Sequence, residues 1–327
     1  MILPWLTPHL LVTVLVIVWL LVALTVAAIL LSHAARVRTE RSQHALDEAA
    51  RPLVARFVLD DPADPGLRAT LRDARGAFGD RVDERLLAVL EGITGEGRER
   101  TVALLVDRGH PARLRRRARS RRALIRAAAI RRLGRLALPA DADLVRRATA
   151  DRAPVVSSVA ARALAAYPGA ASAQAVLDLL RAGASVPQLV VVNSLIGQGE
   201  ADEDALARIR QGLEDPEARV RAACAQVLGE LTSTADAPLL GELLRRDPTA
   251  GVQLAAAGAL RRVGRAGAVP ALLEGTRSAW GPVRLQALQA LLALPREVAA
   301  PALAEVARRG DPLLEPLLPR PADLPGS

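Results

Sequence analysis

The chain has 327 residues and a formal net charge of +9, and it contains no lysine, so its basic side chains are Arg apart from four His. Hydrophobic residues make up 51% of the chain but aromatic residues only 2%, so Ala, Leu and Val supply most of the apolar surface. This composition favours closely packed helices over a sheet, which prefers β-branched and aromatic residues. The one cysteine, Cys224, excludes an intramolecular disulfide framework and a paired-cysteine site.

The first feature in chain order is an apolar segment near the N-terminus. Residues 10–31 carry no formal charge. As a helix rising about 1.5 Å per residue, they would be roughly 33 Å long, enough to cross a hydrocarbon core of about 30 Å. The alternative is a cleavable signal peptide, for which residues 32–34 (Ser-His-Ala) offer a small-x-small site. The apolar run is longer than a usual signal core and no Lys or Arg precedes it, so we expect an uncleaved anchor over residues 1–33.

The charges that flank this segment predict its orientation. Arg36, Arg38 and Arg41 follow it directly. Because positive charge stays on the cytoplasmic side, the short N-terminus should lie outside and the C-terminal part in the cytoplasm. The expected location is therefore the inner (plasma) membrane of a bacterium, with a single pass.

Beyond residue 110 the sequence repeats itself with a period of 31 to 33 residues. Six segments align on an apolar first residue, called the anchor here: Ile125, Val156, Pro187, Val220, Val252 and Val283. Eight residues after each anchor lies a Leu: Leu133, Leu164, Leu195, Leu228, Leu260 and Leu291. Four residues after it lies a small or β-branched residue: Ala129, Ala160, Val191, Cys224, Ala256 and Ala287. Such spacing keeps the three side chains on one face of a helix, so we expect Cys224 to be an inert core residue rather than a reactive thiol.

A second helix should follow each of these first helices. Proline 18 residues after the anchor predicts its start in the last three repeats, at Pro238, Pro270 and Pro301. Asp215 and Asp247, each followed by Pro, predict caps before first helices. Glycine is expected to end first helices at Gly134, Gly197 and Gly229.

The stretches DPEARVRAACAQVLGEL (215–231) and AVPALLEGT (268–276) resemble the bacterial HEAT-like repeats of the phycobilin-lyase type. The resemblance covers about two thirds of the chain and implies an all-α fold, an α-solenoid of helical hairpins preceded by one transmembrane helix. It implies little about activity. Three repeats depart from the pattern, because the Arg that usually follows the anchor is Ser157, Gln188 or Gln253.

The predicted organisation has four parts. The anchor of residues 1–33 precedes a membrane-proximal region at 34–110, with helices near 42–59, 66–76, 80–91 and 98–107 that we interpret as degenerate or capping repeats. The solenoid occupies 111–319 and ends in a short closing helix at 311–319. Residues 320–327 are expected to be a disordered tail.

Enzymatic chemistry is not indicated. The four histidines, His9, His33, His44 and His110, lie outside the matched repeats, which excludes the paired His-Glu motifs of HEAT-type iron hydroxylases. Phosphate-binding, nucleophile-elbow and dinucleotide motifs are also absent from the sequence. We therefore predict no catalytic residues, no cofactor and no metal. The enzyme alternatives by resemblance are a DNA glycosylase of HEAT-like type and a HEAT-like bilin lyase, both usually soluble.

Acidic and basic residues alternate on the expected second helices. Four repeats carry an acid followed three positions later by Arg, a set called the charge ladder here: Asp178 and Arg181, Glu242 and Arg245, Glu274 and Arg277, Glu305 and Arg308. The simplest interpretation is solvated pairs within a helix, worth about 0.2–0.5 kcal/mol each. The alternative is a strip that contacts a partner, and the resemblance places second helices on the concave face, along a groove.

The densest positive charge comes before the repeats. Residues 108–140 contain 12 Arg and no acid. Within them lies the arginine cluster: Arg113, Arg115, Arg116, Arg117, Arg119, Arg121 and Arg122. A helix charged on nearly every side repels itself, which favours an anionic partner over a merely solvated face. The membrane tether favours anionic lipid or an acidic protein over nucleic acid, since the soluble part has few aromatic side chains for bases to stack on.

Together these features predict a noncatalytic scaffold or adaptor, tethered to the membrane, that docks a protein partner. By resemblance, that partner is a membrane enzyme complex such as an envelope glycosyltransferase.

Overall fold

The computed structural model describes residues 8–59, 64–183, 185–264 and 266–319, and over these residues the chain forms helices and turns, with no strand. The predicted tail at 320–327 lies outside the described residues. The chain divides into two compact units, Met1–His110 and Pro111–Ser327.

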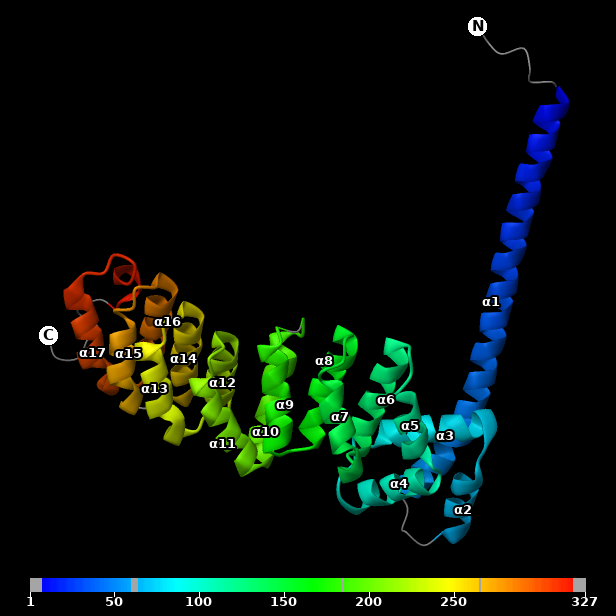
Figure 1. Ribbon diagram of the computed structural model, residues 1–327, viewed down its shortest axis with the longest axis horizontal. Helices are drawn as coiled ribbons and strands as arrows, with labels where there is room; N and C mark the ends of the chain where they lie inside the picture. Colours follow the sequence, from blue (N-terminus) through cyan, green and yellow to red (C-terminus); the bar gives the residue numbers. More distant parts are fainter. Residues whose placement is uncertain (1–7, 60–63, 184, 265, 320–327) are drawn as a thin grey trace. The chain divides into compact units, whose positions relative to one another are not determined.

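The first unit begins with a single long helix. α1 (Pro8–Leu59) joins the predicted apolar segment and the helix predicted at 42–59 without a break (Figure 1). Its Thr13–Leu30 window has a mean hydropathy of 2.9 and none of it is buried, so it is a candidate membrane span. The hydroxyl of Thr25 donates to a carbonyl of the preceding turn at 2.8 Å, so this polar group is satisfied within the helix.

Three shorter helices pack with the C-terminal part of α1. They are α2 (Pro65–Asp73), α3 (Gly76–Val89) and α4 (Gly95–Asp107), close to the predicted ranges. Their shared core contains the fully buried Leu71, Leu86 and Leu104. Asp64 caps α2, where its carboxylate accepts hydrogen bonds from two backbone N–H groups at 3.0 and 3.1 Å.

A buried ionic network ties these helices together. Asp83 on α3 is 3% exposed, and its carboxylate accepts hydrogen bonds from the Arg108 guanidinium and from Nδ1 of His110, the latter at 2.9 Å. Arg108 also donates to carbonyls of Leu71 and Gly79. Burial opposes ionisation of Asp83, but the hydrogen bonds from His110 and Arg108 outweigh it and lower the pKa of this carboxyl.

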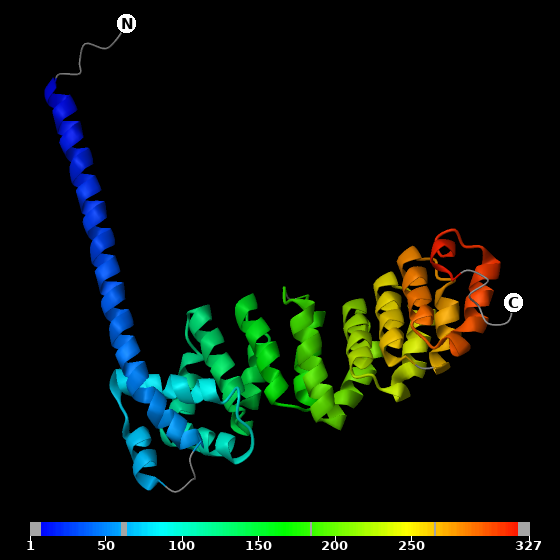
Figure 2. The same ribbon diagram turned by 180° about the vertical axis from the view of Figure 1, so that it is seen from behind.

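The second unit is a stack of helical hairpins. α5 (His110–Arg117) starts at its boundary. Six hairpins follow, in which successive first helices lie side by side in sequence order (Figures 1 and 2). They are α6 (Ala123–Leu136) with α7 (Ala142–Ala148), α8 (Pro154–Ala163) with α9 (Ala170–Arg181), α10 (Gln188–Ala201) with α11 (Glu203–Gln211), α12 (Ala218–Glu230) with α13 (Ala237–Arg246), α14 (Ala250–Val263) with α15 (Val269–Gly275), and α16 (Gly281–Leu292) with α17 (Arg296–Arg309).

The predicted core positions of the repeats are confirmed. The six Leu residues that lie eight positions after the anchors are 0% exposed, and the residues four positions after them are at most 2% exposed. Val156, Val220, Val252 and Val283 are buried anchors. Ile125 is 36% exposed, however, and Pro187 is an exposed residue at the N-cap of α10, so these two anchors are not core residues.

Two sets of helix boundaries differ from the predictions. Pro238 and Pro270 do lie in first turns, but Pro301 lies inside α17, which begins at Arg296. The glycines at 134, 197 and 229 do not end first helices, because α6, α10 and α12 continue beyond them. At Gly229 an added Cβ would lie 2.5 Å from Cα of Ala259 on α14. This glycine is therefore required by the close approach of two helices, not by a helix end.

The predicted closing helix at 311–319 is a turn followed by a short 3₁₀ segment, Glu315–Leu317. Pro312, Pro316 and Pro319 lack the N–H that a regular helix needs, which explains the difference. Leu314 is still 1% exposed, so the turn does bury an apolar side chain at the end of the stack.

Neighbouring hairpins are joined by ion pairs, called the inter-repeat clamps here. In each clamp the Arg directly after the anchor pairs with an Asp in the loop that follows its own hairpin. The pairs are Arg126 with Asp151 at 2.7 Å, Arg221 with Asp247 at 2.6 Å, and Arg284 with Asp311 at 2.9 Å. The same guanidinium groups donate to carbonyls of the loop before their own helix, so each clamp fixes two successive loops.

In two of the three repeats that lack the Arg after the anchor, other residues replace the clamp. Gln253 stands in that position after Val252, and its amide oxygen accepts a hydrogen bond from Ser278 at 2.7 Å. Gln188 stands in the same position after Pro187, and there Asp215 forms its ion pair with a different cation, Arg181 of α9. The carboxylates Asp215 and Asp247 also accept from the backbone N–H groups of Glu217 and Thr249, at 3.0 and 2.8 Å. Glu217 and Thr249 are themselves the N-cap residues of α12 and α14, so the two Asp side chains close the preceding turns and do not cap the helices as predicted.

Candidate functional site

The arginine cluster forms a helix end and a turn rather than a continuous helix. α5 ends at Arg117, and α6 starts only at Ala123. Leu114 on α5 is fully buried. Arg115 pairs with the buried Asp141 at 2.6 Å, and this hydrogen bond raises the pKa of its guanidinium. Arg115 therefore has a structural role.

The remaining cluster residues are mostly in solvent. Arg113 is half-buried, whereas five members are exposed: Arg116, Arg117, Arg119, Arg121 and Arg122. Over the part of the chain that the structure describes, no carboxylate forms an ion pair with these five. The structure thus places concentrated, uncompensated positive charge on the turn between α5 and α6. Binding of an anionic partner there stays a prediction.

The charge ladder forms only in part. Asp178 pairs with Arg181 on α9, Glu242 with Arg245 on α13 at 2.7 Å, and Glu305 with Arg308 on α17. Arg181 also binds Asp215, as described above, so it belongs to a link between repeats.

The fourth ladder pair is rearranged because α15 is short. It ends at Gly275, so Arg277 lies beyond the helix that carries Glu274 and approaches Glu305 of the next hairpin at 3.6 Å. Hydrogen bonds with Arg245 and Arg309, respectively, lower the pKa values of Glu242 and Glu305. The ladder side chains largely satisfy one another, and a partner-binding role for them stays a prediction.

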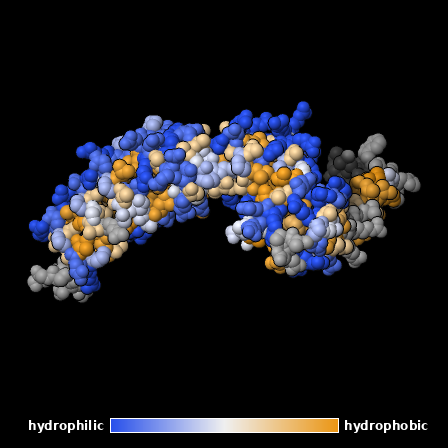
Figure 3. Space-filling view, turned by 90° about the horizontal axis from the view of Figure 1, so that it is seen from below, coloured by the Kyte–Doolittle hydropathy of each residue, from blue (hydrophilic) through white to orange (hydrophobic). Residues whose placement is uncertain are grey.

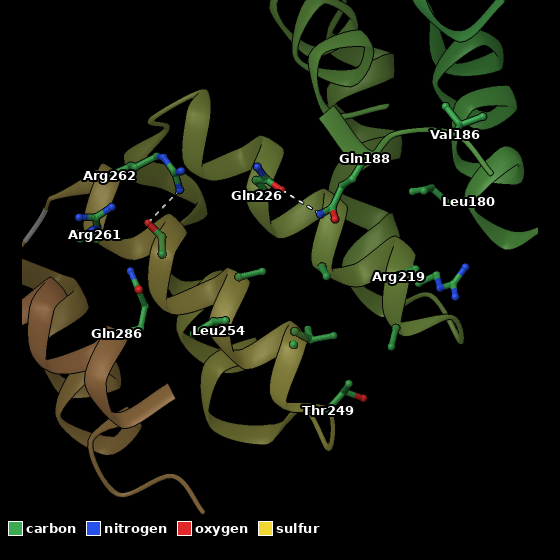
Figure 4. Close-up of a pocket in the computed structure, with 16 residues that line it drawn as sticks. Leu180, Val186, Gln188, Arg219, Gln226, Thr249, Leu254, Arg261, Arg262 and Gln286 are labelled. Atoms are coloured by element: carbon green, nitrogen blue, oxygen red, sulfur yellow. Dashed lines mark hydrogen bonds between the residues drawn. The ribbon is translucent and has the colours of Figure 1, made fainter. Parts of the chain in front are cut away.

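A groove of about 730 Å³ lies elsewhere, mainly between the exposed faces of first helices (Figure 4). Residues of α10, α12, α14 and α16 line it, with Leu180 of α9 as the contribution from a second helix. None of the ladder residues lines this groove. The sequence pattern did not reveal it, although the small residues Gly251, Ala255 and Gly258, spaced along one face of α14, are a signal that could have.

The face of the molecule shown in Figure 3 is largely hydrophilic, with separate apolar patches between the hydrophilic areas. Cys224 is fully buried, and burial, followed by the charge of Asp215, raises the pKa of its thiol to about 12. The predicted core position of this residue is therefore confirmed, and its lack of reactivity stays a prediction. Among the residues that the structure describes, no three His, Cys, Asp or Glu side chains gather as metal ligands.

Comparison with known proteins identifies the repeat class. Residues 173–261 match the family model of HEAT repeats, which confirms the resemblance for this part of the chain. The described residues form helices and turns without strands, so the fold is that of a helical repeat protein, with HEAT repeats shown for residues 173–261. A search of curated proteins finds no match.

Two examples of similar solved structures follow. Human deoxyhypusine hydroxylase in complex with glycerol shares 18% identity with a TM-score of 0.31, over 77% of this chain and 98% of that chain. The complex of CpcE and CpcF of phycocyanin lyase, from a Nostoc species, shares 22% identity with a TM-score of 0.32, over 71% of this chain and 91% of that chain.

Proposed function

We propose that this protein is a noncatalytic, membrane-tethered scaffold whose stacked hairpins dock a protein partner. The observation that carries the proposal is the groove across the first helices of consecutive HEAT-type hairpins. Stacked repeats of this kind present extended surfaces, which suit a segment of another protein better than a small metabolite. The partner class proposed is a membrane enzyme complex.

The tether is the Thr13–Leu30 part of α1, with the C-terminal unit in the cytoplasm. Full-length protein should sediment with membranes and resist extraction at alkaline pH. A soluble mature form starting near residue 35 would contradict the tether. A strongly active alkaline phosphatase fused to the C-terminus would reverse the orientation.

The scaffold role is tested by affinity purification from detergent-solubilised membranes after chemical crosslinking. A partner should be retained at stoichiometric yield, identified by mass spectrometry, and should bind again as a purified protein. The control is a chain in which Leu228, in the core of α12, is replaced by Asp, because an unfolded repeat should lose the partner. If no purified candidate binds, while the chain processes a bilin or excises a damaged base from duplex DNA, an enzyme alternative replaces the scaffold.

A second candidate role follows from the exposed members of the arginine cluster. Five uncompensated guanidinium groups on one turn should attract an anionic surface, since each basic residue near anionic lipid gains about 1 kcal/mol. We expect reversal of Arg116, Arg117 and Arg119 to Glu to weaken binding of a form starting at residue 42 to phosphatidylserine vesicles. Arg115 is left unchanged because of its ion pair with Asp141.

The matched control reverses three exposed Arg at scattered positions, Arg131, Arg162 and Arg296. Binding should fall with salt, because the Debye length shrinks from about 10 Å at 0.1 M to about 3 Å at 1 M. Equal losses in both variants would show that only net charge matters. Stronger binding to duplex DNA or RNA than to vesicles would favour a nucleic-acid partner.

A further inference from the structure

The groove on the first helices is hollow because its floor is made of small residues. On α14, Gly251, Ala255 and Gly258 follow one face of the helix, and Ala218 and Ala222 do the same on α12. A Cβ added at Gly251 would have no atom within 4 Å. This part of the surface is therefore open space along the helix, not a seam between packed helices.

The charges of the groove all have one sign. Arg219 and the pair Arg261 and Arg262 lie on opposite sides of the groove, and Leu254 lies between them (Figure 4). No acidic residue lines the groove. Glu230 pairs with Arg262 at 2.9 Å, whereas Arg219 and Arg261 are exposed and, over the described part of the chain, pair with no carboxylate. Two separated guanidinium groups thus remain available to an anionic ligand.

Between the charges, the groove offers amide and apolar contacts. Gln188 donates to Gln226 at 3.1 Å, so at least two amide groups lie together with spare donors and acceptors, and Gln286 adds a third. Leu254 is 38% exposed, so it presents apolar surface to the groove. Side-chain amides can pair with a peptide backbone, and an exposed Leu can contact one apolar side chain.

We propose that this groove binds an acidic peptide segment of the partner, with carboxylates at Arg219 and Arg261 and an apolar side chain against Leu254. The proposal rests on the scaffold function and names the chemistry of the segment that it docks. A peptide matches the combination of separated cations, uncharged hydrogen-bonding groups and an apolar contact. A lipid headgroup would match only the cations, because its chains would need a continuous apolar surface.

The test is a titration of the detergent-solubilised full-length chain into a fluorescein-labelled Ser/Gly peptide that carries Leu with Glu on both sides, followed by fluorescence anisotropy. Two further peptides replace Glu by Gln or by Arg. The acidic peptide should bind, and both replacements should weaken binding by about tenfold or more. The double variant Arg219→Glu/Arg261→Glu should weaken it similarly, whereas Arg131→Glu, an exposed reversal on α6, should not.

A filled groove gives an independent test. An added Cβ at Gly258 would lie 3.7 Å from the Arg262 guanidinium and 3.8 Å from the Gln286 amide, which are ordinary contacts. Because these contacts are with the ends of flexible side chains, Gly258→Leu should place its side chain in the groove. The Tm of the variant is measured to verify that this buried position tolerates the larger residue. The matched control is Gly97→Leu on α4, where nothing lies within 4 Å of an added Cβ. We expect about tenfold weaker peptide binding only for Gly258→Leu.

The outcomes separate this proposal from the scaffold function. If Gly258→Leu leaves peptide binding unchanged, or if the Arg peptide binds as well as the Glu peptide, the groove proposal is wrong. If the purified partner still binds both groove variants with wild-type affinity, the scaffold stands and docks elsewhere. If the groove variants lose binding to phosphatidylserine vesicles but keep binding to the peptide, the groove is assigned to lipid instead. If the groove variants change only the oligomeric state of the protein, the groove is assigned to a second copy of this chain.

Discussion

The two units of the molecule satisfy their buried charges in different ways. In the first unit, one carboxylate, Asp83, and one guanidinium, Arg108, connect three helices through a network that is almost fully buried. In the second unit, the same residue types form the inter-repeat clamps, each partly exposed and each limited to two neighbouring loops. The two arrangements should therefore respond differently to the loss of one ion pair. Removal of the Asp83–Arg108 pair should open the first unit, whereas removal of one inter-repeat clamp should weaken only the contact between two neighbouring loops.

The largest effect is expected for Arg108→Met. The change leaves the Asp83 carboxylate buried without its main cation and deprives several backbone carbonyls of a donor. Opening of the first unit should become about 3–5 kcal/mol easier. Hydrogen exchange of α2–α4 amides in the full chain measures this. The control Arg68→Met removes an exposed pair with Asp107 and should cost less than about 1 kcal/mol. If the α2–α4 amides are equally protected in Arg108→Met and Arg68→Met, the stability of the first unit does not depend on the buried network.

The same network predicts a dependence on pH. The pKa of Asp83 is lowered from 3.8 by folding, so its contribution to stability is complete above pH 3.8 and is lost as the pH falls through the lower folded value. The protection factors of first-unit amides, which correct for slower intrinsic exchange in acid, should be lower below this pH than at pH 5. In Asp83→Asn the loss of protection that is due to Asp83 should disappear, so that only the acid response of the other carboxylates remains. If Asp83→Asn loses as much protection in acid as the wild type, a group other than Asp83 causes the loss.

In the second unit, the largest expected loss comes from the core. Leu228 is fully buried, so Leu228→Ala should cost about 2–5 kcal/mol and should mainly expose α12 and its neighbours to hydrogen exchange. The control Leu239→Ala, at a position 45% exposed, should stay within about 0.5 kcal/mol. Uniform loss of protection over all hairpins would show that the stack opens as one unit.

A single clamp should matter less. Arg221→Ala removes charged hydrogen bonds to Asp247 and to the loop carbonyls, which should cost about 1.5–3 kcal/mol in denaturant unfolding of the second unit. The chain itself supplies the rescue, because Gln253 and Ser278 already form an uncharged equivalent. Arg221→Gln with Asp247→Ser should recover part of the loss. No recovery would mean that charge, rather than the link between loops, stabilises this position.

The smallest effect is expected on the second-helix surface. Arg245→Ala removes an exposed pair with Glu242, and Arg246 remains to pair with the same carboxylate at 2.6 Å. We expect a change of about 0.2–0.5 kcal/mol, which high salt should reduce. A loss as large as that of Arg221→Ala would show that the charge ladder stabilises the stack.

The repeat period and its core residues could be predicted because they depend on helical spacing alone. Leu228 and Cys224 lie where an offset of four or eight places them, whatever the neighbours are. Gly229 and Pro301 were misplaced because their roles depend on contacts across helices and on where a helix begins. At Gly229 that contact is with Ala259, a residue from the next repeat. The groove could not be predicted either, because its floor is made of small side chains, which the pattern of apolar core positions does not distinguish.

The candidate binding residues were only partly predictable for the same reason. The density of Arg over 113–122 is visible in the sequence, but the pairing of Arg115 with Asp141 requires a fold that brings together residues 26 positions apart. Arg219 and Arg261 stood out less, because their neighbours in sequence include acids or other Arg. Only the stacking of α12 and α14 places both at one groove.

The inter-repeat clamps also have a genetic consequence. Arg221 reaches back to the loop at Asp215 and forward to Asp247, so residues 216–247 form a cassette with matching ends. A tandem duplication of this cassette would give each new Arg an Asp at the correct distance, whereas an insertion of half the length would leave both ends mismatched. The number of hairpins can therefore change in whole steps, and the groove can be lengthened or shortened without redesign of the joints between its parts.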